Sequence, residues 1–211
     1  MLDTDVYRLL ESKLPPDVIH YCFDLWAKYR FQLKIKKNRV SKAGDFTASS
    51  ISHPRITLNA GLNPYAFLIT YIHEVAHLEV YLKYKSRLDP HGTAWKKTFI
   101  QLMQPMMSDL IFPADVLPIL RKHMLNPKAS TYSDAKLTRA LSVYDEVQNP
   151  LPLLSDLPDG SIFKLGKKMF VKGKLRRTRY LCREYKSKRE YLVPAELPVN
   201  LVSPGVFESL S

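Results

Sequence analysis

The feature that most constrains the fold is a long apolar stretch at residues 65–84. Asn63 and Pro64 come directly before it, a pair that suits the start of a helix. Within the stretch, the main polar interruptions are His73, Glu74, His77 and Glu79. A helix that is apolar on nearly every side must pack against neighbours all round. We therefore expect a buried central helix in a domain of the α+β class.

Inside this helix, His73-Glu74-Val75-Ala76-His77 matches the pattern H-E-x-x-H. Residues at i and i+4 project from one helical face, so two imidazoles can bind one tetrahedral zinc ion while Glu74 faces a water on that metal. The pattern predicts a catalytic zinc site with Glu74 as general base. The alternative is a core histidine pair with a buried glutamate, which would leave costly unmet hydrogen bonds.

A catalytic zinc ion usually takes three protein ligands and keeps its fourth position for water. His91 is the best candidate, because it stands just before Gly92 and the next helix, where the chain has room to return to the site. The other histidines, at positions 20, 53 and 123, lack that placement. We therefore predict His73, His77 and His91 as zinc ligands, while His91 could instead be only a turn residue before the helix.

His73-Glu74-x-x-His77 followed by His91-Gly92-Thr93-Ala94-Trp95 resembles the SprT-like metalloprotease family, which includes the Spartan proteases. The resemblance covers about residues 16–105. It implies a minimal zincin-like fold, the same three zinc ligands and base, and cleavage of proteins bound or crosslinked to DNA. Trp95 would be a packing residue that supports His91. Many relatives carry a zinc ribbon with paired cysteines, whereas Cys182 stands alone here.

The periodicity of the chain changes at a Pro-rich stretch, residues 149–160. Before it we expect helices at 4–13, 16–30, 65–84, 92–104, 114–124 and 134–146, and strands at 31–35, 44–50 and 55–59. After it we expect short strands at 162–165, 169–171, 175–183 and 189–193, joined by Gly166, Gly173 and polar turns. The predicted organisation is a metalloprotease domain at 1–125, a helical connector and linker at 126–160, a small basic β-rich subdomain at 161–200, and a tail at 201–211.

The formal net charge of +12 is concentrated in one segment. Residues 164–189 hold twelve Lys and Arg against one acid, Glu184, and seven more basic residues lie between Lys28 and Lys42. Such zones suggest a polyanion partner, most often nucleic acid; the alternative is a solvated face that only aids solubility. The predicted contacts to nucleic acid are Lys172, Lys174, Arg176, Arg177, Arg179, Arg183, Lys186, Lys188 and Arg189.

In the β-rich subdomain, Thr178, Tyr180 and Cys182 alternate with Arg177, Arg179 and Arg183, so the first set is expected to face inward. Tyr180, Tyr185 and Tyr191 either stack on unpaired bases or pack in the small core.

These observations predict a zinc-dependent endopeptidase that acts on DNA-bound or DNA-crosslinked proteins, with single-stranded DNA a possible partner. Two alternatives stay open: a nucleic-acid-binding protein with a structural or vestigial zinc site, and a cytosolic peptidase not coupled to DNA. No apolar run approaches the roughly 20 residues that cross a bilayer, and the N-terminus lacks a basic start and an apolar core. We expect a cytoplasmic monomer that can associate with the nucleoid, with Cys22 and Cys182 reduced.

Overall fold

The computed structural model describes residues 2–37, 42–48, 53–84, 88–129, 134–146 and 151–202. Six α-helices and two small sheets lie in this part of the chain, which confirms the predicted α+β class. The chain divides into two compact units, Met1–Ala129 with Ala140–Glu146 and Ser130–Arg139 with Val147–Ser211. The division falls within helix α6 (Ala135–Ser142). None of the helices in the described ranges is long and apolar enough to cross a membrane.

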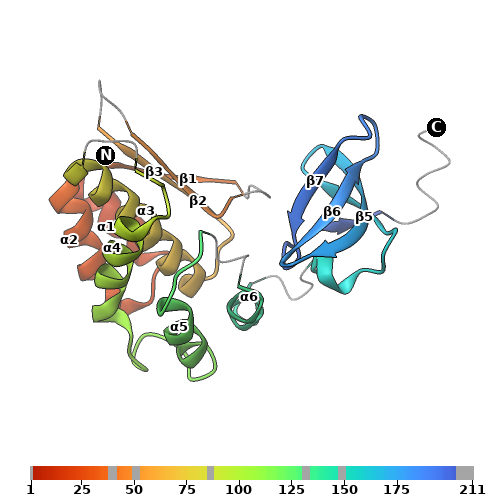
Figure 1. Cartoon of the computed structure of the whole chain (residues 1–211). Helices are drawn as coiled ribbons and strands as arrows, with labels where there is room; N and C mark the ends of the chain where they lie inside the picture. Colours follow the sequence, from red (N-terminus) through yellow and green to blue (C-terminus); the bar gives the residue numbers. More distant parts are fainter. Residues whose placement is uncertain are drawn as a thin grey trace. The chain divides into compact units, whose positions relative to one another are not determined.

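The first unit combines helices with a three-stranded sheet. Its elements are α1 (Asp3–Glu11), η1 (Pro16–Val18), α2 (Ile19–Tyr29), β1 (Gln32–Lys36), β2 (Gly44–Thr47), β3 (Arg55–Asn59), α3 (Pro64–Tyr84), α4 (Thr93–Met103), η2 (Gln104–Met106) and α5 (Leu117–Met124). The strand order is β1-β3-β2, with β1 parallel and β2 antiparallel to β3. Helices α1 to α4 gather on one side of this sheet (Figure 1).

The strands of the first unit follow the sequence pattern. In β1, Leu33 is buried while Lys34 and Lys36 are exposed, as the alternation predicts. The central strand β3 is buried on both faces, since Ile56 to Asn59 are all buried. Because the strand order is β1-β3-β2, strand β2 forms one edge of the sheet. It packs on α3, the helix that carries the H-E-x-x-H motif.

Helix α3 begins at Pro64 and is buried over most of its length, as predicted. Asn63 holds its first turn, because its Oδ1 accepts a hydrogen bond from the Ala66 amide at 2.9 Å. The Asn63 side-chain amide donates to the Leu141 carbonyl at 2.8 Å and to Asp145 Oδ1 at 2.7 Å. The start of the helix is thus tied to the last turn of α6 and to the segment that follows it.

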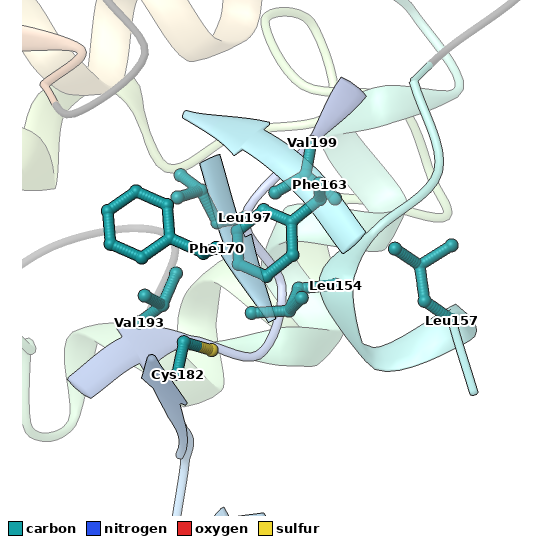
Figure 2. Packing of buried hydrophobic residues seen from close by; sticks show 8 residues of the cluster. All are labelled: Leu154, Leu157, Phe163, Phe170, Cys182, Val193, Leu197 and Val199. Atoms are coloured by element: carbon teal, nitrogen blue, oxygen red, sulfur yellow. The ribbon is translucent and has the colours of Figure 1, made fainter. Parts of the chain in front are cut away.

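The second unit contains a five-stranded antiparallel sheet of order β7-β6-β5-β4-β8. Its elements are η4 (Leu154–Asp156), β4 (Ile162–Leu165), β5 (Lys168–Arg176), β6 (Arg179–Glu184), β7 (Glu190–Pro194) and β8 (Asn200–Leu201). Eight buried apolar side chains form its core, with Phe163, Phe170 and Leu197 grouped at the centre in Figure 2. The Phe163 and Phe170 rings stack, with centroids 5.7 Å apart.

Two sequence-based expectations for this sheet are wrong. Residues 175–183 are not one strand, because the chain turns at Arg177 and Thr178, where Arg177 has φ 58°. Thr178 is therefore exposed in the turn instead of facing inward, whereas Tyr180 and Cys182 face the core as predicted.

Gly173 lies inside β5 and does not form the predicted turn. The register between β5 and β6 shifts between Lys172 and Leu175, and a Cβ on Gly173 would overlap the Leu181 carbonyl oxygen. The glycine therefore marks an irregularity in the sheet where two backbones approach closely.

Some predicted features lie outside the described residues: the end of the second strand at 49–50, the start of the Pro-rich stretch at 149–150, and residues 203–211 of the tail. Arg39, one of the seven basic residues between Lys28 and Lys42, also lies outside them.

Candidate metal centre

Three histidines from two elements converge on one point in the first unit. His73 and His77 lie one turn apart on α3, and His91 precedes Gly92, the N-cap of α4. The Nε2 atoms are 3.2 Å apart for His73 and His77, 3.1 Å for His77 and His91, and 3.3 Å for His73 and His91. The structure thus brings the three predicted ligands together.

The spacing of these atoms fits a metal ion better than it fits hydrogen bonds among the rings. Tetrahedral nitrogen ligands at 2.0–2.1 Å from zinc lie about 3.3–3.4 Å from one another. A neutral ring nitrogen either carries a hydrogen or offers a lone pair, so three Nε2 atoms in a triangle cannot all be satisfied by one another. One metal ion at the centre would satisfy all three lone pairs. Across the described residues, this is the group of His, Cys, Asp or Glu side chains close enough to hold an ion.

Burial keeps the three imidazoles neutral, which is the form that binds metal. The pKa of His73 lies well below its ordinary value because the ring is buried, with further lowering by His77 and His91. Burial, followed by the proximity of His91, lowers the pKa of His77 to about 4. The pKa of His91 is also lowered by burial, although the carboxylate of Asp89 opposes the shift.

Trp95 forms a shared support beneath all three rings. Its ring centroid lies 4.6 Å from that of His73, 4.7 Å from that of His91 and 5.3 Å from that of His77. The indole is fully buried, stacks on Phe99 at 5.0 Å, and its Nε1 donates to the His73 carbonyl at 3.4 Å. Sequence reasoning expected support of His91 alone, whereas one tryptophan restricts the orientation of the whole set.

A short turn returns the chain to the site at His91. Asp89 Oδ1 accepts a hydrogen bond from the His91 amide at 3.3 Å, and the Asp89 carbonyl accepts one from the Gly92 amide at 3.0 Å. Sequence reasoning missed Asp89, although an aspartate two residues before a histidine in Asp-Pro-His-Gly is a turn signal.

Glu74 lies on the neighbouring face of α3, toward the edge strand β2. The side chain is buried, with 5% of the residue exposed. A Cβ on Gly44 would be 2.8 Å from Glu74 Oε1 and 3.0 Å from Glu74 Cγ, so the carboxylate lies directly against the strand backbone. Glu79, by contrast, accepts a hydrogen bond from the Tyr29 hydroxyl at 2.6 Å and is not part of the histidine group. Glu74 thus lies in the same helical turn as the two histidines of the motif.

Eight of the nine predicted nucleic-acid contacts are exposed in the second unit; they are Lys174, Arg176, Arg177, Arg179, Arg183, Lys186, Lys188 and Arg189. Lys172 is the exception and the prediction for it is wrong. It is 4% exposed, its Nζ donates to the Leu157 carbonyl, and it lies 3.9 Å from the centroid of the Tyr180 ring. An amino group held inside the core in this way cannot reach a phosphate.

The outer face of β5 and β6 carries several arginines. Arg179 and Arg183 alternate with inward-facing Tyr180 and Cys182, and Arg176 pairs directly with Arg179 across the two strands. Like charges directly opposite each other destabilise a sheet unless an anion lies between or beside them. The outer face of these two strands therefore concentrates positive charge.

Glu184, the single acid of residues 164–189, lies on the other face of β6. It is 8% exposed and accepts hydrogen bonds from Ser187 Oγ at 2.6 Å, Lys168 Nζ at 3.2 Å and the Tyr191 hydroxyl at 3.2 Å. These bonds, with that from Ser187 the strongest, lower the pKa of the Glu184 carboxyl. The carboxylate thus organises the turn between β6 and β7 and does not neutralise the arginines outside.

The three tyrosines of this segment differ in their contacts, although Tyr185 and Tyr191 are similarly exposed. Tyr180 packs against the core, and Tyr191 contacts the Phe170 ring edge-on at 5.5 Å, so both contribute to packing. Tyr185 lies in the turn after β6, with Lys188 Nζ 4.7 Å from its ring centroid.

Compared with known proteins, the chain matches no family model, no curated protein and no solved structure.

Proposed function

We propose that this protein is a zinc-dependent endopeptidase whose centre consists of His73, His77, His91 and Glu74. The observation that carries the proposal is the convergence of three imidazole Nε2 atoms, 3.1–3.3 Å apart, beside a helix turn that also holds a buried carboxylate. The resemblance of the His73–Trp95 motif to SprT-like metalloproteases, with their minimal zincin-like fold, supports the same assignment.

The ligand set favours zinc in a catalytic role over a structural one. Structural zinc sites usually close with four protein ligands, often cysteines, whereas catalytic sites keep one position open. The group formed by the described residues has three members, all histidines. Of the two cysteines, Cys22 is buried in α2 and Cys182 is buried in the second unit. Zinc held by these three histidines would keep its fourth position for water and substrate.

When bound, zinc supplies Lewis acidity, which brings the pKa of a bound water toward 7 and polarises a peptide carbonyl. The protein's own contribution is proton transfer and orientation. One oxygen of the Glu74 carboxylate accepts the proton of the attacking water and then donates it to the nitrogen of the leaving amine. The neutral imidazoles keep their lone pairs directed at one point, and Trp95 restricts the motion of their rings.

The experiment that tests this proposal is the Glu74→Gln variant of the zinc-loaded protein. The variant should keep its zinc, measured by atomic emission, and lose cleavage of a DNA-binding protein substrate by about 10²–10⁴-fold, the range for a general base. Glutamine nearly matches glutamate in size and cannot carry the proton. Wild-type cleavage by Glu74→Gln would contradict the proposed role.

We also propose that DNA couples to this activity through the outer face of β5 and β6, because Arg176, Arg179 and Arg183 lie there on paired strands. Cleavage should then require DNA and weaken steeply as salt rises, since phosphate contacts release counterions. Cleavage without DNA would favour a general peptidase. Binding of DNA without any Glu74-dependent cleavage would favour a nucleic-acid-binding protein with a structural or vestigial site.

A further inference from the structure

Helix α3 presents two functional stripes to two different neighbours. His73 and His77 face Trp95 of α4, whereas Thr70 and Glu74 face Gly44 of β2. Farther along the second stripe, Tyr81 contacts the ring of Phe46 in β2, with centroids 5.7 Å apart. The edge strand therefore packs along the same stripe that carries the carboxylate.

We propose that Gly44 is a positioning residue for the Glu74 carboxylate, an inference that rests on the proposed function of Glu74. A Cβ at position 44 would lie 2.7 Å from Thr70 Cγ2, 2.8 Å from Glu74 Oε1 and 3.0 Å from Glu74 Cγ. Distances below 3.0 Å essentially never occur for real Cβ atoms. Every residue other than glycine has a Cβ atom, and at position 44 this atom would overlap the Glu74 carboxylate.

The neighbours of Gly44 cannot easily move aside. Glu74 and Thr70 are 5% and 7% exposed, so neither side chain can swing into solvent. The Thr70 hydroxyl also donates to the Ala66 carbonyl at 2.7 Å, which fixes its rotamer. An added methyl group would therefore displace the carboxylate or push β2 away from α3.

The backbone does not explain why glycine stands here. Positive φ angles among the described glycines occur at Gly160 and Gly166, not at Gly44, which pairs with Leu58 in the antiparallel ladder. Glycine inside a strand is unfavourable because it loses more conformational freedom on folding than other residues. The close approach of Thr70 and Glu74 is the feature that requires it.

The position of a general base matters because a displacement of about 1 Å in a reacting group can cost about 10²-fold in rate. Gly44→Ala should therefore lower kcat about 10- to 100-fold, with KM changed less than about twofold and zinc retained. Thr47→Ala is the matched control, since Thr47 lies in the same strand, exposed and on the opposite face. Wild-type kcat in Gly44→Ala, or a change in KM alone, would overturn the proposal.

A rescue variant separates the two contacts of the added methyl group. Thr70→Ser removes the threonine methyl that a Cβ at position 44 would overlap, and it keeps the hydroxyl. Introduced together with Gly44→Ala, it should restore part of the lost resistance to urea but not kcat, because the contact with Glu74 remains. Full recovery of kcat would show that Thr70, and not Glu74, is the residue on which position 44 acts.

A measurement on zinc-free protein tests the contact without any catalysis. In a double-mutant cycle followed by tryptophan fluorescence, Gly44→Ala should lower the urea midpoint at least twice as much with Glu74 present as in the Glu74→Ala background. Equal shifts would overturn the contact. If Glu74→Gln keeps full cleavage but the cycle shows coupling, the proposed function fails while the packing of Gly44 on Glu74 stands, so the two failures are distinguishable.

Discussion

The two units place their polar chemistry in opposite environments. In the first, the His73 and His77 rings and the Glu74 carboxylate are largely buried on an apolar helix and His91 is half-buried beside them, so each needs a defined partner. In the second, the basic side chains are exposed on a sheet whose core is apolar. Buried polar groups are restricted to few arrangements, so the spacing of a motif in the first unit predicts how its side chains are arranged. Exposed cations are not restricted in this way, and their spacing in the sequence says less.

Lys172 and His73 show that burial of a nitrogen does not by itself define a function. Lys172 satisfies its amino group within its own unit through the Leu157 carbonyl and the Tyr180 ring. The three Nε2 atoms of the histidine group lie close to one another, but mutual hydrogen bonds cannot satisfy all three at once. The difference lies in whether the protein itself supplies a partner for each buried nitrogen. It does so for Lys172, whereas the three histidine lone pairs can be satisfied together by a metal ion.

The largest expected effect is loss of the metal from the first unit alone. His77→Ala should bind no zinc after dialysis and lose cleavage by about 10³-fold or more, because the ion supplies the Lewis acidity. DNA affinity, measured by fluorescence anisotropy, should stay unchanged. His20→Ala is the control, since His20 is exposed, lies far from the histidine group in the sequence, and contacts the ring and the hydroxyl of Tyr7. Full zinc occupancy in His77→Ala would contradict the assigned ligand set.

Replacing one buried aromatic residue in each unit by alanine tests whether the core of the first unit also supports metal binding. Trp95→Ala and Phe163→Ala should each lower the free energy of unfolding of their own unit by about 3–5 kcal/mol, the usual effect of removing a buried aromatic ring. Only Trp95→Ala should also weaken zinc binding, because Trp95 contacts all three ligand rings. Urea denaturation followed by circular dichroism and a zinc titration measure the two effects. Equal loss of zinc affinity in both variants would break the comparison.

The first unit should also respond to acid in a way that the second does not. The pKa of His77 is about 4 in the folded state against 6.5 for the free side chain, so the unfolded chain binds protons first as the pH falls. Stability in zinc-free buffer should therefore be complete above pH 6.5 and decline down to about pH 4, by about 3 kcal/mol for this residue.

Two features of the sequence make this pH prediction measurable. Both tryptophans, Trp26 and Trp95, belong to the first unit, so tryptophan fluorescence reports on that unit alone. No histidine follows His123 in the sequence, and the pKa of Glu184 is lowered by its hydrogen bonds, so above about pH 5 the second unit provides an internal control. A free energy of unfolding of the first unit that is flat between pH 7 and pH 4.5 would contradict the expected linkage.

The smallest expected effect concerns the outer face of the second unit. Arg179→Glu with Arg183→Glu should weaken binding of an oligonucleotide about 10- to 100-fold and reduce the salt slope by about 2, with zinc content unchanged. Lys97→Glu with Lys122→Glu makes the same change in net charge at exposed positions of the first unit and is the matched control. Equal losses in the two variants would show that overall charge, and not this face, attracts the nucleic acid.

Much of the metal centre could be predicted from local patterns. The spacing of His73 and His77 follows from the helical repeat, and the position of His91 before a helix left the chain room to return. The contact of Trp95 with all three rings could not be predicted, because it depends on how α4 packs against α3. Gly44 was missed for the same reason, since its neighbours Thr70 and Glu74 belong to a distant part of the chain.

The second unit was harder to predict because the turn between β5 and β6 lacks the usual signals. Arg177 takes a left-handed conformation with φ 58° in a turn without Gly, Asn or Pro, so the alternation appeared to continue through it. Gly173, which looked like a turn residue, permits a close approach of two strands. The turn-residue preferences are tendencies, and here the strand register prevailed over them.

By itself, the sequence determined the α+β class, the buried central helix and the candidate ligand residues. These depend on periodicities of two and 3.6 residues, which act over a few positions of the chain. Only the tertiary structure decided that three Nε2 atoms meet at one point, that Lys172 turns into a core, and that Gly44 makes room for a carboxylate. Such contacts join residues far apart in sequence, so they depend on how whole elements pack and no local pattern contains them.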